Sequence, residues 1–257
     1  MGMGGGFPPP FPFLMNEEYK ECLSRKLSIR HLRGATATTT DSLLLAAFLK
    51  PVEGEAAELG AGGGIVSLLA ASRGRFHHAD LYERDATLAA LAAKNVEENR
   101  LSERLTVLCA DVRELVGRRY LSVYANPPYR RANEGRGAKN PLADLARFER
   151  AGTLFDFIAA AERILLPGGS LSLVLPGARL PDAEAAFAEV GLRLAERVSV
   201  YPYPGGVPKL CLLRAEREVC RPRLSRFTLA RERAGAPTRE ALALYEEGIL
   251  FTEGDTE

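Results

Sequence analysis

The motif that points most specifically to a chemical function is Asn126-Pro127-Pro128-Tyr129. It stands at the end of an apolar run at residues 121–126. Two consecutive prolines restrict the backbone and remove amide donors. The Asn126 side-chain oxygen and the Pro127 carbonyl can therefore both accept hydrogen bonds from one amine. Tyr129 offers an aromatic face on which a planar group can stack. The tetrapeptide thus predicts a site for a planar group with an exocyclic nitrogen, and the alternative is a proline-rich exit turn with an aromatic lid.

A second chemical signal is the glycine-rich stretch Glu58-Leu59-Gly60-Ala61-Gly62-Gly63-Gly64, which follows a strand-like run and precedes a helical one. Gly60, Gly62 and Gly64 let the backbone approach a ligand and direct free helix N-terminal amides toward it. A turn without a ligand, or a dinucleotide-binding loop, would show the same pattern. Glu58 favours another ligand, because a carboxylate there would repel a pyrophosphate but suit the ammonium and sulfonium charges of S-adenosylmethionine.

Two further carboxylates stand at the ends of the next strand-like runs. Glu83 ends the run at residues 78–83, where an acid can accept hydrogen bonds from both hydroxyls of a ribose. Asp111 follows the run at 105–110 and is a candidate acceptor for an adenine amine. Asp111 could equally be the N-cap of a helical turn over residues 112–116, and the two roles are compatible.

The elements that must position these residues alternate between short strands and helices, which predicts an α/β fold with a mostly parallel sheet covered on both faces. The third helix meets Pro167-Gly168-Gly169, a helix stop that returns the chain to the sheet. The expected strands are seven, at 55–60, 78–83, 105–110, 121–126, 170–176, 194–201 and 209–216. The expected crossover helices are at 65–73, 86–99, 152–166 and 182–190.

Composition sets the domain organisation and excludes several classes of protein. The 34 Lys and Arg residues balance 33 Asp and Glu residues, so a polyanion would have to bind a local basic patch. We expect residues 1–14 to be a disordered Gly/Pro-rich tail, 15–50 an N-terminal cap segment and 51–257 the main domain. No apolar run is long enough to span a bilayer and no signal peptide is evident, which predicts a cytoplasmic protein. The four cysteines have no paired short spacing, and the three histidines have no metal-ligand spacing, so no metal is expected.

Together, ELGAGGG, YERD, CADV and NPPY in this order resemble the class I methyltransferases that act on exocyclic nitrogens. Further segments narrow the resemblance to the bacterial tRNA1(Val) adenosine-37 N6-methyltransferase family, over about residues 20 to 250. Phe148 departs from this family, which usually has His there, and the loop 130–145 is unusually rich in Arg and Gly. The segments that carry the narrower match are Thr40-Asp41-Ser42-Leu43-Leu44-Leu45, Lys139-Asn140, Ala146-Arg147-Phe148-Glu149, and the closing strand with Pro208 and Leu210 to Leu213.

The resemblance implies a Rossmann-like class I methyltransferase fold, S-adenosylmethionine as cofactor and the N6 of an adenine in tRNA as acceptor. It implies that Asn126, Pro127 and Tyr129 are catalytic and that no metal is needed. Asp41 would help to close the cofactor site, although Thr40-Asp41 could also be the N-cap of a helix at 42–49. The implied cofactor-binding residues are Asp41, Glu58, Gly60, Gly62, Gly64, Glu83, Asp111 and Asn126.

A basic cluster surrounds the predicted catalytic loop and includes Arg130, Arg131, Arg136 and Lys139. It would bind RNA phosphates, or it is a solvated face of the protein. Two other functions stay open. One is a methyltransferase that modifies a glutamine side chain of release factors, although such enzymes usually carry a larger N-terminal domain than the 50 residues before Pro51. The other is a non-catalytic module that binds S-adenosylmethionine or RNA, which the intact NPPY segment disfavours.

Overall fold

A computed structural model describes residues 18–23, 27–33, 36–117, 120–128, 152–250 and 253–254. The predicted tail at residues 1–14 and Tyr129, which the sequence predicts to be catalytic, lie outside these ranges. So does the basic cluster Arg130, Arg131, Arg136 and Lys139, together with Phe148. In the part of the chain that the structure describes, no helix is long and apolar enough to cross a membrane.

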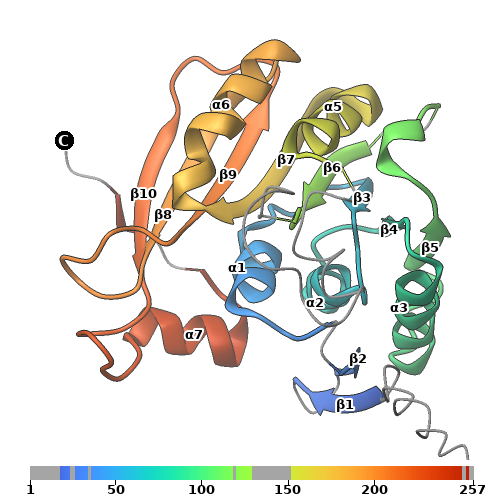
Figure 1. The fold of residues 1–257 in the computed structure, drawn as a ribbon, viewed down its shortest axis with the longest axis horizontal. Helices are drawn as coiled ribbons and strands as arrows, with labels where there is room; N and C mark the ends of the chain where they lie inside the picture. The colour runs from blue at the N-terminus through green and yellow to red at the C-terminus, as the bar shows by residue number, and fades with distance from the viewer. Residues whose placement is uncertain are drawn as a thin grey trace, which may run out of the picture.

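Within the described ranges, nine strands form a mixed sheet at the centre of the molecule, in the order β11-β10-β8-β9-β7-β6-β3-β4-β5 (Figure 1). Strands β5, β4, β3, β6 and β7 are mutually parallel, and β9 is antiparallel to both β7 and β8. The central strands are β3 (Glu55–Leu59), β4 (His78–Glu83), β5 (Leu105–Cys109), β6 (Tyr120–Ala125) and β7 (Leu165–Pro176). The outer strands are β8 (Arg193–Tyr201), β9 (Leu210–Glu216), β10 (Arg223–Thr228) and β11 (Glu253–Gly254).

The prediction of a mostly parallel sheet with helices on both faces is confirmed, but the expected number of seven strands is wrong. The seven predicted strands are all present, and β10 and β11 extend the sheet beyond β8. Strand β10 pairs in parallel with β8 and buries Ser225 and Phe227, whereas Arg223 and Arg226 of the same strand are exposed. Only one large apolar side chain of this strand is fully buried, so its sequence carries little of the alternation that identifies a strand.

Two helical layers cover the sheet (Figure 1). One apolar core joins β-strand side chains to α1 (Thr40–Phe48), α2 (Ile65–Ser72), the C-terminal half of α3 (Ala86–Glu98) and α7 (Arg239–Glu247). A second core on the opposite face contains α5 (Leu154–Ile164) and α6 (Leu180–Glu189). Short 3₁₀ turns follow β5 (η1, Val112–Glu114) and β7 (η2, Gly177–Arg179). Both faces of the central strands are therefore buried, as expected for parallel strands.

The boundary between α5 and β7 differs from the prediction, which continued the helix to residue 166. Helix α5 ends at Ile164, and β7 begins at Leu165 and runs through the Pro167-Gly168-Gly169 segment. The pairing of β6 with β7 shifts in register between Tyr120 and Ser122. A Cβ atom on Gly169 would lie 2.9 Å from the Tyr120 carbonyl oxygen, so a glycine is needed for this close approach. The segment is thus an irregular strand start as well as a helix stop.

An N-terminal hairpin that the sequence did not predict packs against α3 at the bottom of Figure 1. Strand β1 (Glu18–Cys22) pairs antiparallel with β2 (Ser28–Leu32), and they form a separate two-stranded sheet. Lys20 and Arg30 both form ion pairs with Glu98 on α3, at 3.1 and 2.5 Å. Leu32 completes a small apolar cluster with Leu88 and Leu91.

Candidate functional site

The candidate site lies at the carboxyl edge of the parallel strands, where open α/β sheets bind ligands. The register places Leu59 of β3 beside Tyr82 of β4 and Ala125 of β6. Glu83 at the end of β4 pairs with Cys109 at the end of β5. The glycine segment, Glu83, Asp111 and Asn126 therefore leave neighbouring strands at one edge.

The glycine segment forms a tight loop between β3 and α2. The amides of Gly60 and Ala61 both donate to the Tyr82 carbonyl, at 2.8 and 3.0 Å. Gly62 has a φ of +56°, and a Cβ atom built on it would meet no atom within 4 Å. Gly64, the N-cap of α2, has a φ of +79° and no side chain to cap the helix. The glycines therefore provide a left-handed path, and Gly62 presents open backbone to an approaching ligand.

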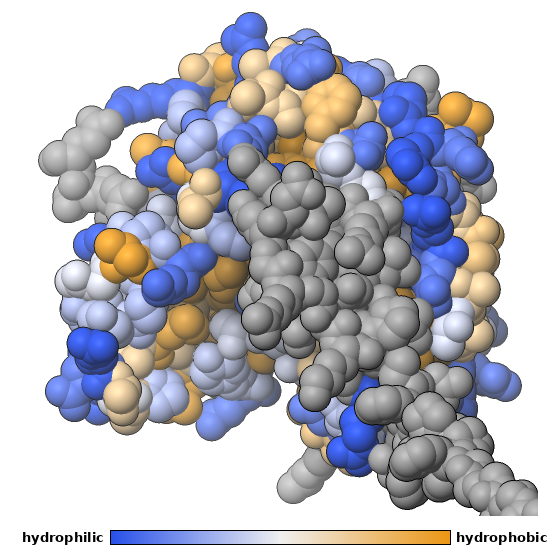
Figure 2. Space-filling model, in the orientation of Figure 1, coloured by the Kyte–Doolittle hydropathy of each residue, from blue (hydrophilic) through white to orange (hydrophobic). Residues whose placement is uncertain are grey.

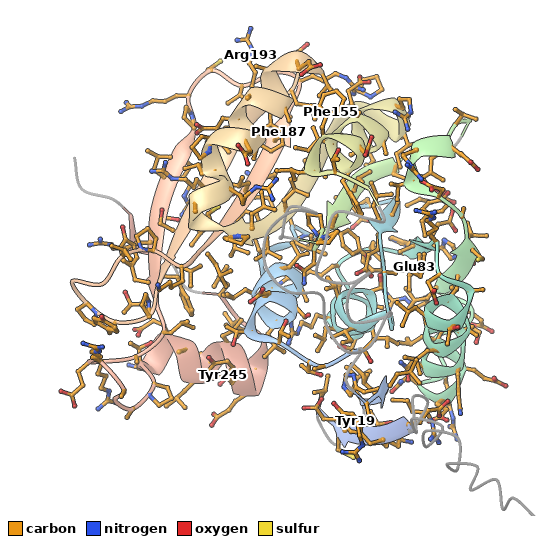
Figure 3. All side chains as sticks on the ribbon, in the orientation of Figure 1. Tyr19, Glu83, Phe155, Phe187, Arg193 and Tyr245 are labelled. Carbon is orange, nitrogen blue, oxygen red and sulfur yellow. The ribbon has the colours of Figure 1, made fainter. Side chains whose placement is uncertain are left out.

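Glu83, which is labelled in Figure 3, is 7% exposed. It joins β4 to the glycine loop. Its Oε2 accepts the Gly62 amide at 2.8 Å, and its Oε1 accepts the Asp85 amide at 2.8 Å. Burial raises the pKa of this carboxyl above its ordinary value, and the two amide hydrogen bonds act in the opposite direction. A carboxylate in this position, against the open side of Gly62, can accept further hydrogen bonds from hydroxyl groups.

Glu58 lies beneath the loop and is only 2% exposed. Its Oε2 accepts the Ser67 amide at 3.1 Å and also the Ser67 hydroxyl, which in turn lies 2.7 Å from the Tyr124 hydroxyl. The carboxyl group thus caps α2 from the neighbouring strand, in place of the side chain that Gly64 lacks. Burial raises the pKa of Glu58 to about 8. The structure thus shows a capping role for Glu58. The contact of Glu58 with a cationic ligand stays a prediction.

Asp111 follows β5 and caps η1, since its Oδ1 accepts the Arg113 amide at 3.0 Å. The capping alternative is therefore confirmed for the turn Val112–Glu114, although the helix expected to reach residue 116 ends two residues earlier. The Arg113 guanidinium also donates to both carboxylate oxygens, at 2.9 and 2.6 Å, and Arg84 lies 3.3 Å away. Hydrogen bonds from Arg113 lower the pKa of Asp111 to about 2. Asp111 stays ionised, and a ligand amine would share this acceptor with Arg113.

Asp41 lies in the first turn of α1 and is half-buried. The N-cap of this helix is Thr39, whose Oγ1 accepts the Ser42 amide at 3.4 Å. The prediction that Thr40-Asp41 caps a helix at 42–49 is therefore wrong, because the helix spans Thr40–Phe48 and begins two residues earlier. A threonine at 39 with extended backbone presents its hydroxyl to the amide three residues later, whereas Thr40 already belongs to the helix. Asp41 is left with its carboxylate at the positive end of the helix.

Asn126, Pro127 and Pro128 follow β6 directly. Pro127 is buried, whereas Asn126 and Pro128 are half-exposed. On one side β6 pairs with β3, which leads into the glycine loop, and on the other with β7. Asn126 therefore enters the same edge as the glycine loop with part of its surface accessible. The fourth residue of the tetrapeptide, Tyr129, lies outside the described residues.

Three contributors to this site were not predicted, namely Ser67, Tyr124 and Asn95. Ser67 stands three residues after the glycine N-cap, at a position whose amide needs an acceptor. Asn95 is 1% exposed and lies on the buried face of α3, which it shares with the apolar residues Leu91, Ala92 and Val96. A polar residue inside an apolar helical stripe is a signal that could have been found. Tyr124 carries no such signal, because tyrosine is common in buried strands.

A family model, the methyltransferase small domain, matches residues 37–185, which cover more than half of the chain and include every described site residue. The sheet order and the motifs at its carboxyl edge agree with this match. The fold and the site thus define a methyltransferase, and the chain belongs to the methyltransferase small domain family.

Curated relatives narrow this membership to one group. A tRNA1(Val) (adenine(37)-N6)-methyltransferase of Aeromonas salmonicida is 30% identical over 170 residues, which cover 65% of this chain and 71% of the relative. The protein of the same name from Aeromonas hydrophila is 28% identical over 195 residues, with 75% and 82% covered. The chain belongs with the tRNA1(Val) (adenine(37)-N6)-methyltransferases, as the sequence motifs predicted.

Solved structures support the same fold. A predicted O-methyltransferase from Agrobacterium tumefaciens superposes with a TM-score of 0.64 at 25% identity, covering 82% of this chain and 98% of the other. The 16S rRNA N2 G1207 methyltransferase of Thermus thermophilus, solved in complex with AdoMet and guanosine, gives a TM-score of 0.55 at 23% identity. That match covers 82% of this chain and 52% of the other, and it bears on the fold alone.

Proposed function

We propose that this protein transfers a methyl group from S-adenosylmethionine to the exocyclic N6 of adenosine 37 in tRNA1(Val). The observation that carries the proposal is the Asn126-Pro127-Pro128 turn on β6 beside the glycine loop on β3, in a chain related to enzymes named for this reaction. The turn suits an amine acceptor, and the loop with its acidic neighbours suits a nucleoside with a cationic tail.

The residues at the sheet edge fit S-adenosylmethionine. The space in front of Gly62 is open, so a ligand can contact the protein backbone there. Glu83 offers carboxylate oxygens beside it for ribose hydroxyls. Asp111, ionised beside Arg113, is an acceptor for the adenine amine. Asp41 supplies negative charge at the start of α1 for the amino acid portion. Glu58, whose pKa of about 8 keeps it protonated near neutral pH, supports the loop by capping α2. When bound, S-adenosylmethionine supplies an electrophilic methyl group on a positively charged sulfur.

The residues of the NPPY segment position the acceptor nitrogen for direct in-line transfer. The Asn126 side-chain oxygen and the Pro127 carbonyl each accept a hydrogen bond from one N–H of the amine. These hydrogen bonds draw the nitrogen lone pair out of conjugation with the ring. Tyr129 provides a stacking surface for the base. Positive charge is dispersed during the transfer, so orientation and exclusion of water supply most of the rate gain. Water or a weak base takes the released proton afterwards.

An RNA substrate fits the requirement that the base be accessible. An adenine must leave its stack to enter a pocket at the end of a strand, and in a single-stranded loop this costs a few kcal/mol or less. Adenosine 37 lies beside the anticodon, in such a loop. The basic residues Arg130, Arg131, Arg136 and Lys139 would meet the phosphates around it.

The experiment that tests the proposal combines cofactor binding with an assay of the acceptor. We expect S-adenosylmethionine and S-adenosylhomocysteine to bind in calorimetric titrations and NAD to give no heat. The amides of Gly60, Ala61, Gly62 and Gly64, which a pyrophosphate would need, already donate hydrogen bonds within the protein. With labelled S-adenosylmethionine, unmodified tRNA should be methylated, and digestion should give N6-methyladenosine.

Purified release factors form the control arm of this assay. Label on a glutamine of the release factors, with none on tRNA, would establish the protein-modifying alternative. Tight NAD binding without a response to S-adenosylmethionine would overturn the cofactor assignment.

A further inference from the structure

Asn95 joins three segments that are distant in sequence. It lies on α3 and is 1% exposed. Its Oδ1 accepts the Arg30 amide at 2.8 Å, and its Nδ2 donates to the Arg30 carbonyl at 3.1 Å and to the Gly63 carbonyl at 2.9 Å. One side-chain amide thus connects the N-terminal hairpin, helix α3 and the glycine loop.

Asn99, one turn further along α3, makes the same kind of contact with the hairpin. Its Oδ1 accepts the Ser28 amide at 3.0 Å, and its Nδ2 donates to the Ser28 carbonyl at 2.7 Å. Four residues of helix rise about 6 Å and two residues of strand about 6.8 Å, so the two asparagines match alternate residues of the β2 edge. The two side chains differ beyond the hairpin, because the Nδ2 of Asn99 also bonds to its own helix, at the Asn95 carbonyl.

The Gly63 contact fixes one peptide plane of the loop. The carbonyl of Gly63 accepts from Asn95, and the amide of Gly64, in the same peptide unit, donates to the Ala61 carbonyl at 2.8 Å. The amide of Gly62, two residues before Gly64, donates to Glu83. The loop is therefore held at adjacent points from β4 and from α3. Without Asn95, the Gly63 carbonyl would be left buried and unpaired or would rotate, and the neighbouring amides would turn with it.

We propose that Asn95 is a positioning residue for the cofactor loop, and that its hydrogen bonds to β2 hold the side chain in place for that role. This inference rests on the proposed function, which assigns the glycine loop to S-adenosylmethionine. Asn95 acts by fixing the orientation of the loop before the cofactor binds, which lowers the cost of ordering the loop on binding.

The test compares Asn95→Ala with Asn99→Ala, since each removes two hydrogen bonds to the β2 backbone and only the first releases Gly63. Both variants should lower the melting temperature by several degrees. Asn95→Ala should weaken S-adenosylmethionine binding about tenfold in calorimetry, as expected for the loss of one preorganising hydrogen bond. It should raise KM for S-adenosylmethionine with kcat within about twofold. Asn99→Ala should leave the affinity within about twofold.

A second pair, Asn95→Asp and Asn99→Asp, keeps side-chain shape and the acceptor for the β2 amide. It decides the matter if Asn95→Ala does not fold. Asn95→Asp loses the donor to Gly63 and places a carboxylate against its carbonyl, so cofactor affinity should fall at least as far as in Asn95→Ala. Equal losses of affinity at positions 95 and 99, or wild-type affinity at 95, would overturn the inference.

A Gly62→Ala variant separates this inference from the proposed function. The added methyl group enters the open space in front of the loop, and alanine is strained at the φ of +56°. Both effects should weaken S-adenosylmethionine binding if the loop is the cofactor site. Weak binding by Gly62→Ala with normal binding by Asn95→Ala would refute the role of Asn95 alone. Normal binding by Gly62→Ala would refute the cofactor site itself.

Discussion

At the scale of single residues, Asn126 has the most direct proposed part in the reaction. It is half-exposed at the end of β6, and Pro127 and Pro128 restrict the backbone that follows it. A neutral acceptor in this place can bind an amine without adding a charge beside a sulfonium group. The acidic side chains at the same edge, Glu83 and Asp111, are engaged by backbone amides and by Arg113, which favours binding roles for them over proton transfer.

We expect Asn126→Ala to lower kcat by about two to three orders of magnitude, because it removes a preorganised acceptor whose hydrogen bond matters mainly in the transition state. The affinity for S-adenosylmethionine should remain near that of the wild type. Single-turnover methylation of tRNA, with calorimetry as the control for cofactor binding, measures both.

Asn126→Asp is the sharper companion variant. Aspartate preserves the shape and still accepts a hydrogen bond from the amine, so the residual activity should exceed that of the alanine variant. The substitution differs from asparagine by the charge that it adds. Wild-type rates for Asn126→Ala would show that the NPPY turn is only a structural exit from β6.

At the scale of elements, the contact between β3 and α2 shows how a helix without a capping side chain is completed. Gly64 provides the left-handed turn into α2 but cannot cap it, and Glu58 on the preceding strand accepts the Ser67 amide instead. Hydrogen bonds from Ser67 favour the ionised carboxylate, whereas burial favours the protonated acid and has the larger effect. The result is a carboxyl group that holds a proton in the folded protein near neutral pH.

This proton makes stability depend on pH in a defined direction. The Glu58 pKa is 4.5 ordinarily and about 8 in the folded protein. Because the folded state holds the proton more tightly, the stabilisation is complete below pH 4.5 and is lost as the pH rises toward 8. This loss approaches about 1.4 kcal/mol per pH unit for one group. Glu58→Gln stays neutral, so its free energy of unfolding should fall less steeply between pH 5 and 8 than that of the wild type.

Urea unfolding at several pH values measures this difference. Glu83 also has a raised pKa, and it contributes a slope of the same sign to both proteins. The comparison between wild type and Glu58→Gln therefore isolates Glu58. Parallel stability curves for the two proteins would contradict a protonated Glu58.

At the scale of the whole molecule, charge is balanced, with a net charge of +1. Hydrophilic side chains are spread around the face in Figure 2. A protein with so small a net charge gains little from its overall field when it binds RNA, so phosphate contacts must be local. The basic cluster that follows Asn126-Pro127-Pro128 in sequence is the local patch that we propose for this role.

Replacing Arg130, Arg131, Arg136 and Lys139 together by glutamine should weaken tRNA binding and flatten its salt dependence. Each lost phosphate contact reduces the slope of log K against log salt by about 0.7 to 0.9, so four contacts reduce it by about three. Cofactor affinity should not change. A control for the loss of positive charge elsewhere replaces Arg193 and Arg223 by glutamine. These residues begin β8 and β10 at the opposite edge of the sheet. An unchanged slope in the fourfold variant would place the RNA-binding surface elsewhere.

Local pattern in the sequence determined much of this protein. The seven core strands, the four crossover helices and the motif at each strand end were predicted because runs of apolar residues and turn residues are local signals. The order of motifs then placed Gly60, Glu83, Asp111 and Asn126 at one edge, since parallel strands must all end there. The methyltransferase family followed from the same residues.

Tertiary structure alone decided what those side chains contact. Glu58 caps α2, Asp111 shares its carboxylate with two arginines, and Asn95 links the hairpin to the glycine loop. Strand β10 forms because it pairs with β8. The N-terminal hairpin is held by hydrogen bonds between the β2 backbone and side chains of α3. A sequence specifies such contacts only through the completed fold, because a hydrogen bond between residues 30 and 95 has no local signature in either segment. The spacing of residues along the chain thus defined the motifs, and packing between distant elements defined their partners and their protonation.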